Sequence, residues 1–79
     1  MTEEQIMTRL CEIIRDVFDD ESITVDKNTT AADIDGWDSI MHITLISEVE
    51  AAFSVRFAMK DVLSMQNVGD LARAVLALV

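Results

Sequence analysis

Residues 36–53 read GWDSIMHITLISEVEAAF, and this stretch contains the pattern that decides the fold. Its apolar residues recur at spacings of three and four, which predicts a long amphipathic helix. They are Ile40, Ile43, Ile46, Val49 and Phe53, with Leu45 and Ala52 beside them. Asp38 is a favoured N-cap residue, so we expect the helix to begin at Ser39.

A second amphipathic helix is predicted at the start of the chain. Thr2 followed by Gln5 has the form of a capping box, and Glu3 and Glu4 supply the negative charge that a helix N-terminus favours. The apolar positions again have helical spacing, which extends the helix to about residue 19; they are Ile6, Leu10, Ile13, Ile14, Val17 and Phe18.

The segment between these helices, residues 20–37, is rich in short polar residues and predicts a long loop. Loops of this length are uncommon in small domains and are often functional. We expect Ile23, Val25 and Ile34 to hold it against the core.

The last third of the chain predicts one short helix and one longer helix. Residues 59–64 have room for one or two turns, and Asn67 with Asp70 resembles a cap for the final helix. The expected inner face of that helix comprises Val68, Leu71, Ala72, Val75, Leu78 and Val79. No alternating strand pattern occurs. The expected fold is therefore all-α: a single domain over residues 1–79, with a bundle of three main helices and one short helix.

Composition restricts the function. The chain is 51% hydrophobic with a net charge of −9, which favours a folded protein that repels nucleic acid and anionic membranes. It has no long apolar run and no basic leader, so a cytoplasmic monomer without membrane insertion is expected. One cysteine and one histidine cannot build a metal centre of the usual kind, and 79 residues leave little room for an enzymatic cleft.

Ser39 is the candidate for chemistry. At the first helical position its hydroxyl can point outward, and a phosphodiester on that oxygen would lie beside free backbone N–H groups at the positive end of the helix. The alternative is an ordinary helix cap with no function. His42 lies one turn later, but a hydrolytic Ser–His pair would also need an orienting acid and oxyanion donors.

The sequence resembles the acyl carrier protein family along essentially the whole chain. The family's attachment motif is Asp-Ser-Leu or a close variant at the start of the second of four helices, and Asp38-Ser39-Ile40 matches it. The resemblance implies that a phosphopantetheinyl transferase attaches 4′-phosphopantetheine from coenzyme A to Ser39. It also implies that acyl groups are carried as thioesters on the arm and that the carrier catalyses nothing.

Two positions depart from the pattern of the fatty-acid-synthesis members, since Met41 and Thr44 stand where acids are common. A less charged face suggests partners that use apolar contact as well as charge, namely acyl-loading and acyl-processing enzymes with basic or apolar docking patches. The expected partner face comprises Asp38, Ile40, Met41, Thr44 and Glu48. The candidates for lining an acyl-chain site are Ile43, Ile46, Val62 and Leu63, which are equally compatible with plain core positions.

Three alternatives stay open on sequence alone. The cargo could belong to fatty acid, polyketide or another acyl pathway. A carrier of aminoacyl or peptidyl groups would share the fold and the serine. A helical protein-interaction module that is never modified would share only the fold.

Overall fold

The first helix, α1 (Glu3–Val17), begins at the predicted capping box. The Thr2 hydroxyl accepts a hydrogen bond from the Gln5 backbone N–H, and the Gln5 side chain accepts one from the Thr2 N–H. The helix ends two residues earlier than expected, because Asp19 adopts a left-handed backbone conformation with φ of 51°. Such a residue cannot continue a right-handed helix.

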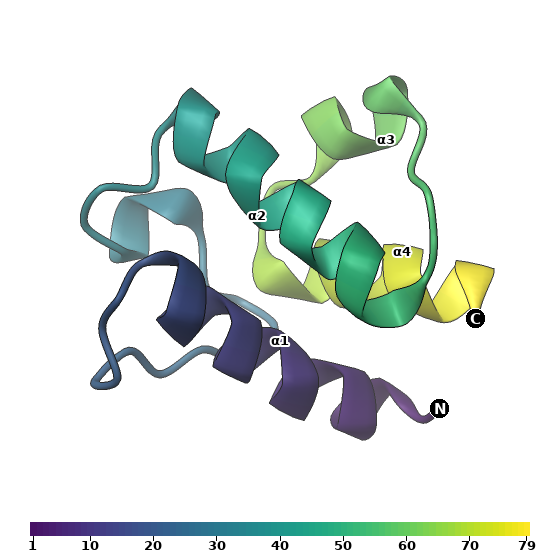
Figure 1. Ribbon diagram of the computed structural model, residues 1–79, viewed down its shortest axis with the longest axis horizontal. Coiled ribbons are helices and arrows are strands. Elements are labelled where there is room, and N and C mark those ends of the chain that lie inside the picture. The colour runs from purple at the N-terminus through teal and green to yellow at the C-terminus, as the bar shows by residue number, and fades with distance from the viewer.

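The computed structural model describes residues 1–79 and confirms the predicted all-α fold (Figure 1). The other helices are α2 (Ser39–Phe53), α3 (Met59–Ser64) and α4 (Val68–Leu78), and a short 3₁₀ turn, η1 (Ala31–Asp33), interrupts the long loop. Helix α1 packs against both α2 and α4. In Figure 1, α2 crosses the middle of the molecule, with α1 on one side of it and α3 on the other.

The core is formed by thirteen buried apolar side chains from all four helices and the loop: Ile6, Leu10, Ile13, Ile14, Ile34, Leu45, Ile46, Val49, Val62, Val68, Leu71, Ala72 and Val75. Ile40 and Ile43 share the apolar period of α2 and are exposed. Ile40 also belongs to the expected partner face, and Ile43 is a candidate for an acyl-lining or a core position. Helix α2 has apolar residues around most of its circumference, so spacing alone does not reveal which stripe turns inward. The inward stripe includes Leu45, Ile46 and Val49.

Helix α4 is capped as predicted, since the Asn67 side chain accepts a hydrogen bond from the Asp70 backbone N–H at 2.8 Å. Its inner face ends at Val75. Leu78 and Val79, predicted to be buried, are about half exposed. They stand at the C-terminal end of α4, which lies at the edge of the molecule (Figure 1).

The long loop is held to the core and to both neighbouring helices. Ile34 is buried and Ile23 and Val25 pack against the core, as predicted. The Arg15 guanidinium donates to the Ile23 carbonyl oxygen at 2.6 Å, and the Val68 N–H at the start of α4 donates to the carbonyl oxygen of buried Thr29 at 2.9 Å. These contacts therefore fix the position of the loop that precedes α2. No helix is long and apolar enough to span a membrane.

Candidate functional site

Ser39 is the first residue of α2, directly after the N-cap. Asp38 is extended, and its carboxylate accepts a hydrogen bond from the Met41 backbone N–H at 2.9 Å. The side-chain hydrogen bonds of this turn involve Asp38 and Thr44 and leave the hydroxyl of exposed Ser39 free. The sequence pattern predicted this helix start correctly, because an aspartate cap and an apolar helical period meet at one residue.

The backbone around Ser39 offers donors to an anion. A helix leaves its first N–H groups without intrahelical acceptors, and Asp38 accepts only that of Met41. The N–H groups of Ser39 and Ile40 remain available beside the serine oxygen. Together with the positive end of the helix dipole, they form an environment suited to a phosphate group attached at that oxygen.

A cavity of about 330 Å³ opens beside Ser39, between the start of α2, helix α3 and the start of α4. Its wall combines apolar and polar side chains and comprises Ala31, Trp37, Asp38, Ser39, His42, Val62, Leu63, Met65, Gln66, Asn67, Val68 and Leu71. A group attached to the Ser39 hydroxyl could therefore extend directly into this partly apolar cavity.

Trp37 and His42 form one wall of this cavity. The indole N–H of Trp37 donates to His42 Nδ1 at 3.2 Å, and His42 Nε2 lies 3.2 Å from the carbonyl oxygen of Val62. The indole also packs against Phe18, with ring centroids 5.6 Å apart. Both histidine nitrogens are engaged in these contacts, so His42 is not paired with Ser39 as a nucleophile and base.

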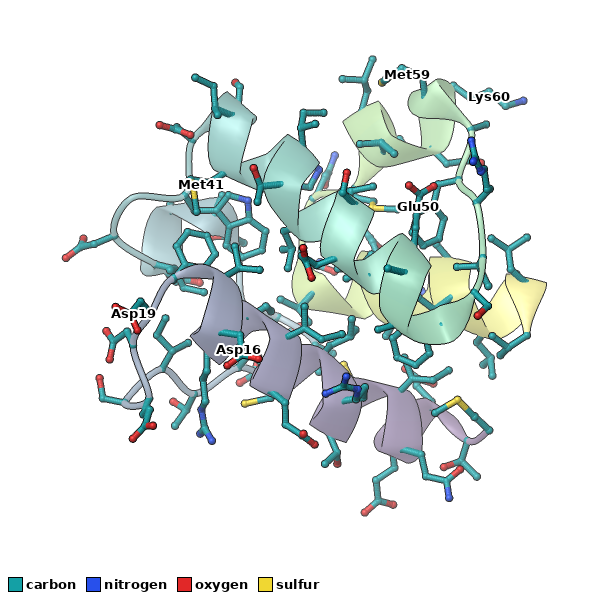
Figure 2. The ribbon with its side chains drawn as sticks, viewed as in Figure 1. Asp16, Asp19, Met41, Glu50, Met59 and Lys60 are labelled. Carbon is teal, nitrogen blue, oxygen red and sulfur yellow. The ribbon has the colours of Figure 1, made fainter.

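The predicted partner residues lie on the outside of α2. Ile40, Thr44 and Glu48 are exposed and follow one another at four-residue spacing, which places them on one face of the helix. Asp38 is exposed at the helix start. Met41 is half-buried in the first turn of α2, on the same side of the molecule as Asp16 and Asp19 (Figure 2).

The four candidate acyl-lining residues lie in three different environments. Val62 and Leu63 line the cavity beside Ser39. Ile43 is 48% exposed on α2, and Ile46 is buried in the core. Residues of the α3–α4 segment complete the cavity, among them Met65 and Asn67. No sequence signal pointed to them, because their role depends on where α3 and the start of α4 lie relative to Ser39.

Two carboxyl groups outside this site have altered acidity. Hydrogen bonds from the Ser22 hydroxyl and backbone N–H lower the pKa of Asp20. The Gln66 backbone N–H, followed by the Arg73 guanidinium, lowers the pKa of Asp70. No three His, Cys, Asp or Glu side chains lie close enough to hold a metal ion.

Comparisons with known proteins identify the family. Residues 8–75 match the family model described as the phosphopantetheine attachment site. The chain is also similar to the solution NMR structure of the holo acyl carrier protein from Geobacter metallireducens, with a TM-score of 0.86 and 42% identity; the match covers 91% of this chain and 83% of that chain. This chain belongs to the acyl carrier protein family. No curated protein matches it significantly.

Membership of the acyl carrier protein family removes one of the three alternatives left open by the sequence and leaves the cargo open. Its cofactor is a covalently attached 4′-phosphopantetheine, so an unmodified interaction module is excluded. Acyl carrier proteins are non-catalytic, are modified by phosphopantetheinyl transferases and interact with enzymes of acyl metabolism.

Proposed function

We propose that this acyl carrier protein bears its 4′-phosphopantetheine arm on Ser39. The observation that carries the proposal is the position of the Ser39 hydroxyl: exposed, free of hydrogen bonds within the chain, at the first turn of α2 and at the mouth of the cavity. The arm supplies the thiol on which acyl groups are held as thioesters. The chain's own residues fit such a group, since the N–H groups of Ser39 and Ile40 can bind its phosphate.

Enzyme partners, in this proposal, bind the outer face of α2 next to Ser39 and the adjoining surface of α3. Asp38, Ile40, Met41, Thr44 and Glu48 form the α2 part. The first turn of α2 has no acidic residue, and Ile40 is 76% exposed. On α3, Leu63 and Met59 are 75% and 62% exposed, and Met59 and Lys60 project at the outer end of that helix (Figure 2). Exposed apolar side chains grouped in this way are typical of a binding surface.

Charge supports rapid encounter with these enzymes. Eight of the fifteen acids lie between Asp16 and Asp38, where Lys27 is the single base, so the negative field is concentrated ahead of Ser39. Basic surfaces on partner enzymes would be attracted over a distance, and apolar contacts at Ile40 and Leu63 would then select the correct orientation. A carrier that moves between enzymes needs this combination of fast binding and fast release.

The cavity beside Ser39 is the proposed shelter for the acyl group. Val62 and Leu63 contribute to its wall, together with apolar side chains such as Met65 and Leu71. Ile43 and Ile46 do not line the cavity, so this role is not extended to them. The uncharged first turn of α2 favours a specialised acyl pathway over general fatty acid synthesis. Fatty, polyketide and aminoacyl cargo remain alternatives, and we expect the carrier to work as a monomer in the cytoplasm.

The experiment is measurement of intact mass after incubation with coenzyme A, magnesium and a broad-specificity phosphopantetheinyl transferase. We expect the wild-type chain and a Ser47→Ala control to gain one phosphopantetheine each, and Ser39→Ala to gain none. Ser47 is a suitable control because it is an exposed serine on the same helix. A mass gain on Ser39→Ala would place the arm elsewhere and refute the proposal.

A further inference from the structure

His42 joins three segments of the chain that surround the cavity. Its own helix, α2, carries Ser39; its Nδ1 contacts Trp37 at the end of the long loop; and its Nε2 contacts the Val62 carbonyl oxygen of α3. Both contacts measure 3.2 Å, and the ring lies at 26° to the Trp37 ring with centroids 6.0 Å apart. His42, Trp37 and Val62 all line the cavity.

The two contacts determine which tautomer of the neutral ring is present. The Trp37 indole can only donate, so Nδ1 must accept and cannot carry a proton. The Val62 carbonyl can only accept, so Nε2 must carry the proton and donate it. Protonation of the ring would put a hydrogen on Nδ1, directly against the indole N–H, and would break the Trp37 contact.

Helix α3 has few other attachments. It contains only six residues, its N-cap Ala58 makes no side-chain hydrogen bond, and Val62 is its single buried residue. A helix of this length is unstable without tertiary contacts. The preceding segment is tied to α2, because the Phe57 N–H donates to the Glu50 carboxylate at 2.8 Å. Within α3 itself, the Val62 carbonyl makes the one hydrogen bond to the rest of the molecule, and Val62 is the one buried side chain.

We propose that His42, neutral and protonated at Nε2, acts as a latch that holds α3 and Trp37 around the cavity beside Ser39. Loss of the latch, by protonation or substitution, lets α3 move away from α2 and opens the cavity. His42 is thus a positioning residue, acting through Trp37 and Val62. The proposal rests on the proposed function only for the identity of the group that enters the cavity; the latch belongs to the unmodified chain.

The charged groups near the latch are few. Asp38 is the only other titratable side chain in the cavity wall, and the Met41 N–H donates to its carboxylate. Asp35 ahead of Trp37, and Lys60 and Asp61 ahead of Val62, are exposed. Helix α4 contributes only the apolar Val68 and Leu71 to the wall. His42 and Asp38 are therefore the titratable side chains of the cavity wall.

The first test is the tautomer of His42 in the unmodified chain, measured from its ¹⁵N chemical shifts by NMR above the pH at which the ring loses its charge. We expect Nε2 to be protonated and Nδ1 to be free, with the Trp37 indole N–H protected from exchange. Protonation at Nδ1, or a freely exchanging indole N–H, would overturn the proposal.

The second test is hydrogen exchange of the Leu63 and Ser64 amides in variants of the unmodified chain. His42→Phe keeps a ring but removes both contacts, so protection of these amides should fall about two- to tenfold. His42→Gln can still donate to the Val62 oxygen and cannot become charged; it should retain more protection than His42→Phe and lack the pH dependence that the latch predicts for the wild type. Amides of α1 and α4 report whether each variant remains folded.

Equal protection of α3 in the wild type and a folded His42→Phe would overturn the latch. So would a pH dependence of α3 protection that persists in His42→Gln. Both results are independent of whether Ser39 accepts the arm, which distinguishes failure of the latch from failure of the proposed function.

Discussion

The backbone of Gly69, in the first turn of α4, lies directly against the backbone of Lys27 in the long loop. The Gly69 N–H donates to the Lys27 carbonyl oxygen at 2.9 Å, and a Cβ on Gly69 would lie only 2.7 Å from that same oxygen. This contact, together with the neighbouring bond from Val68 to Thr29, fixes the loop that leads into Ser39.

Replacement of Gly69 by alanine should therefore destabilise the protein by about 1–3 kcal/mol, because the added methyl group would force two backbone segments apart. The free energy of unfolding from urea titration measures this. Alanine normally improves a helix by up to about 1 kcal/mol over glycine, so the expected sign is opposite to that of helix propensity. Ala77→Gly, at an exposed position of α4, is the control and should show the ordinary loss. Unchanged or increased stability of Gly69→Ala would contradict the contact.

The ionised carboxylate of Asp70 should stabilise the folded protein, and this contribution should be lost in acid. Hydrogen bonds from the Gln66 N–H and Arg73 lower its pKa below the ordinary value of 3.8. A lowered pKa contributes stability that is present above the unfolded-state value and is lost as the pH falls through the folded-state value. Asp70→Asn should therefore have a lower Tm than the wild type at pH 7, and the difference should shrink as the pH falls below about 4. Asp61→Asn, whose side chain makes no hydrogen bond, is the control. A difference in Tm that is independent of pH would contradict the role of the charge.

The apolar surface next to Ser39 should matter for binding and not for folding. Ile40→Ser and Leu63→Ser should change the free energy of unfolding by no more than about 0.5 kcal/mol, because both side chains are about three-quarters exposed. The same changes should raise KM for the phosphopantetheinyl transferase, since apolar contact area is lost. Leu78→Ser, at an exposed position near the end of α4, is the matched control. If all three variants are modified with the wild-type KM, the proposed partner face is wrong.

Association should depend on the acids ahead of Ser39. The value of kcat/KM for modification should fall as salt rises from about 0.05 M to about 0.5 M, because ions screen the attraction. Asp35→Asn should lower kcat/KM at low salt by about two- to fivefold and reduce its dependence on salt. Glu3→Gln, at the far end of α1, should leave the rate close to that of the wild type. An equal effect of both substitutions would show that net charge, and not the acidic loop, governs association.

The sequence predicted the helices well because their signals are local. The capping box at Thr2, the Asp38 cap and the Asn67 cap each depend on residues within one turn, and all three occur as expected. The inward stripe of α2 was predicted less well. An apolar period that fits more than one face does not show which face is buried. Ile43, a candidate for an acyl-lining or a core position, is 48% exposed, and Ile40, which shares the period but belongs to the expected partner face, is 76% exposed.

In the candidate site, too, only the features that depend on neighbouring residues could be predicted. Ser39 could be singled out from the cap and the motif beside it, both of which are local. The cavity could not be derived, because its wall is assembled from the end of the loop, α2, α3 and the start of α4. The His42 contacts with Trp37 and Val62 span 5 and 20 positions in the chain, and neither follows from helical spacing, because Trp37 precedes α2 and Val62 lies in α3.

The most direct test of the central claim is to locate the arm within the modified chain by tandem mass spectrometry. Trypsin cleaves after Lys27 and Arg56, so one peptide, residues 28–56, contains Ser39 together with Ser47 and Ser54. We predict that every fragment containing Ser39 carries the added phosphopantetheine mass and that fragments containing only Ser47 or Ser54 do not. An added mass that follows another residue of this peptide, or that lies on a different peptide, would contradict the assignment of Ser39 as the attachment site.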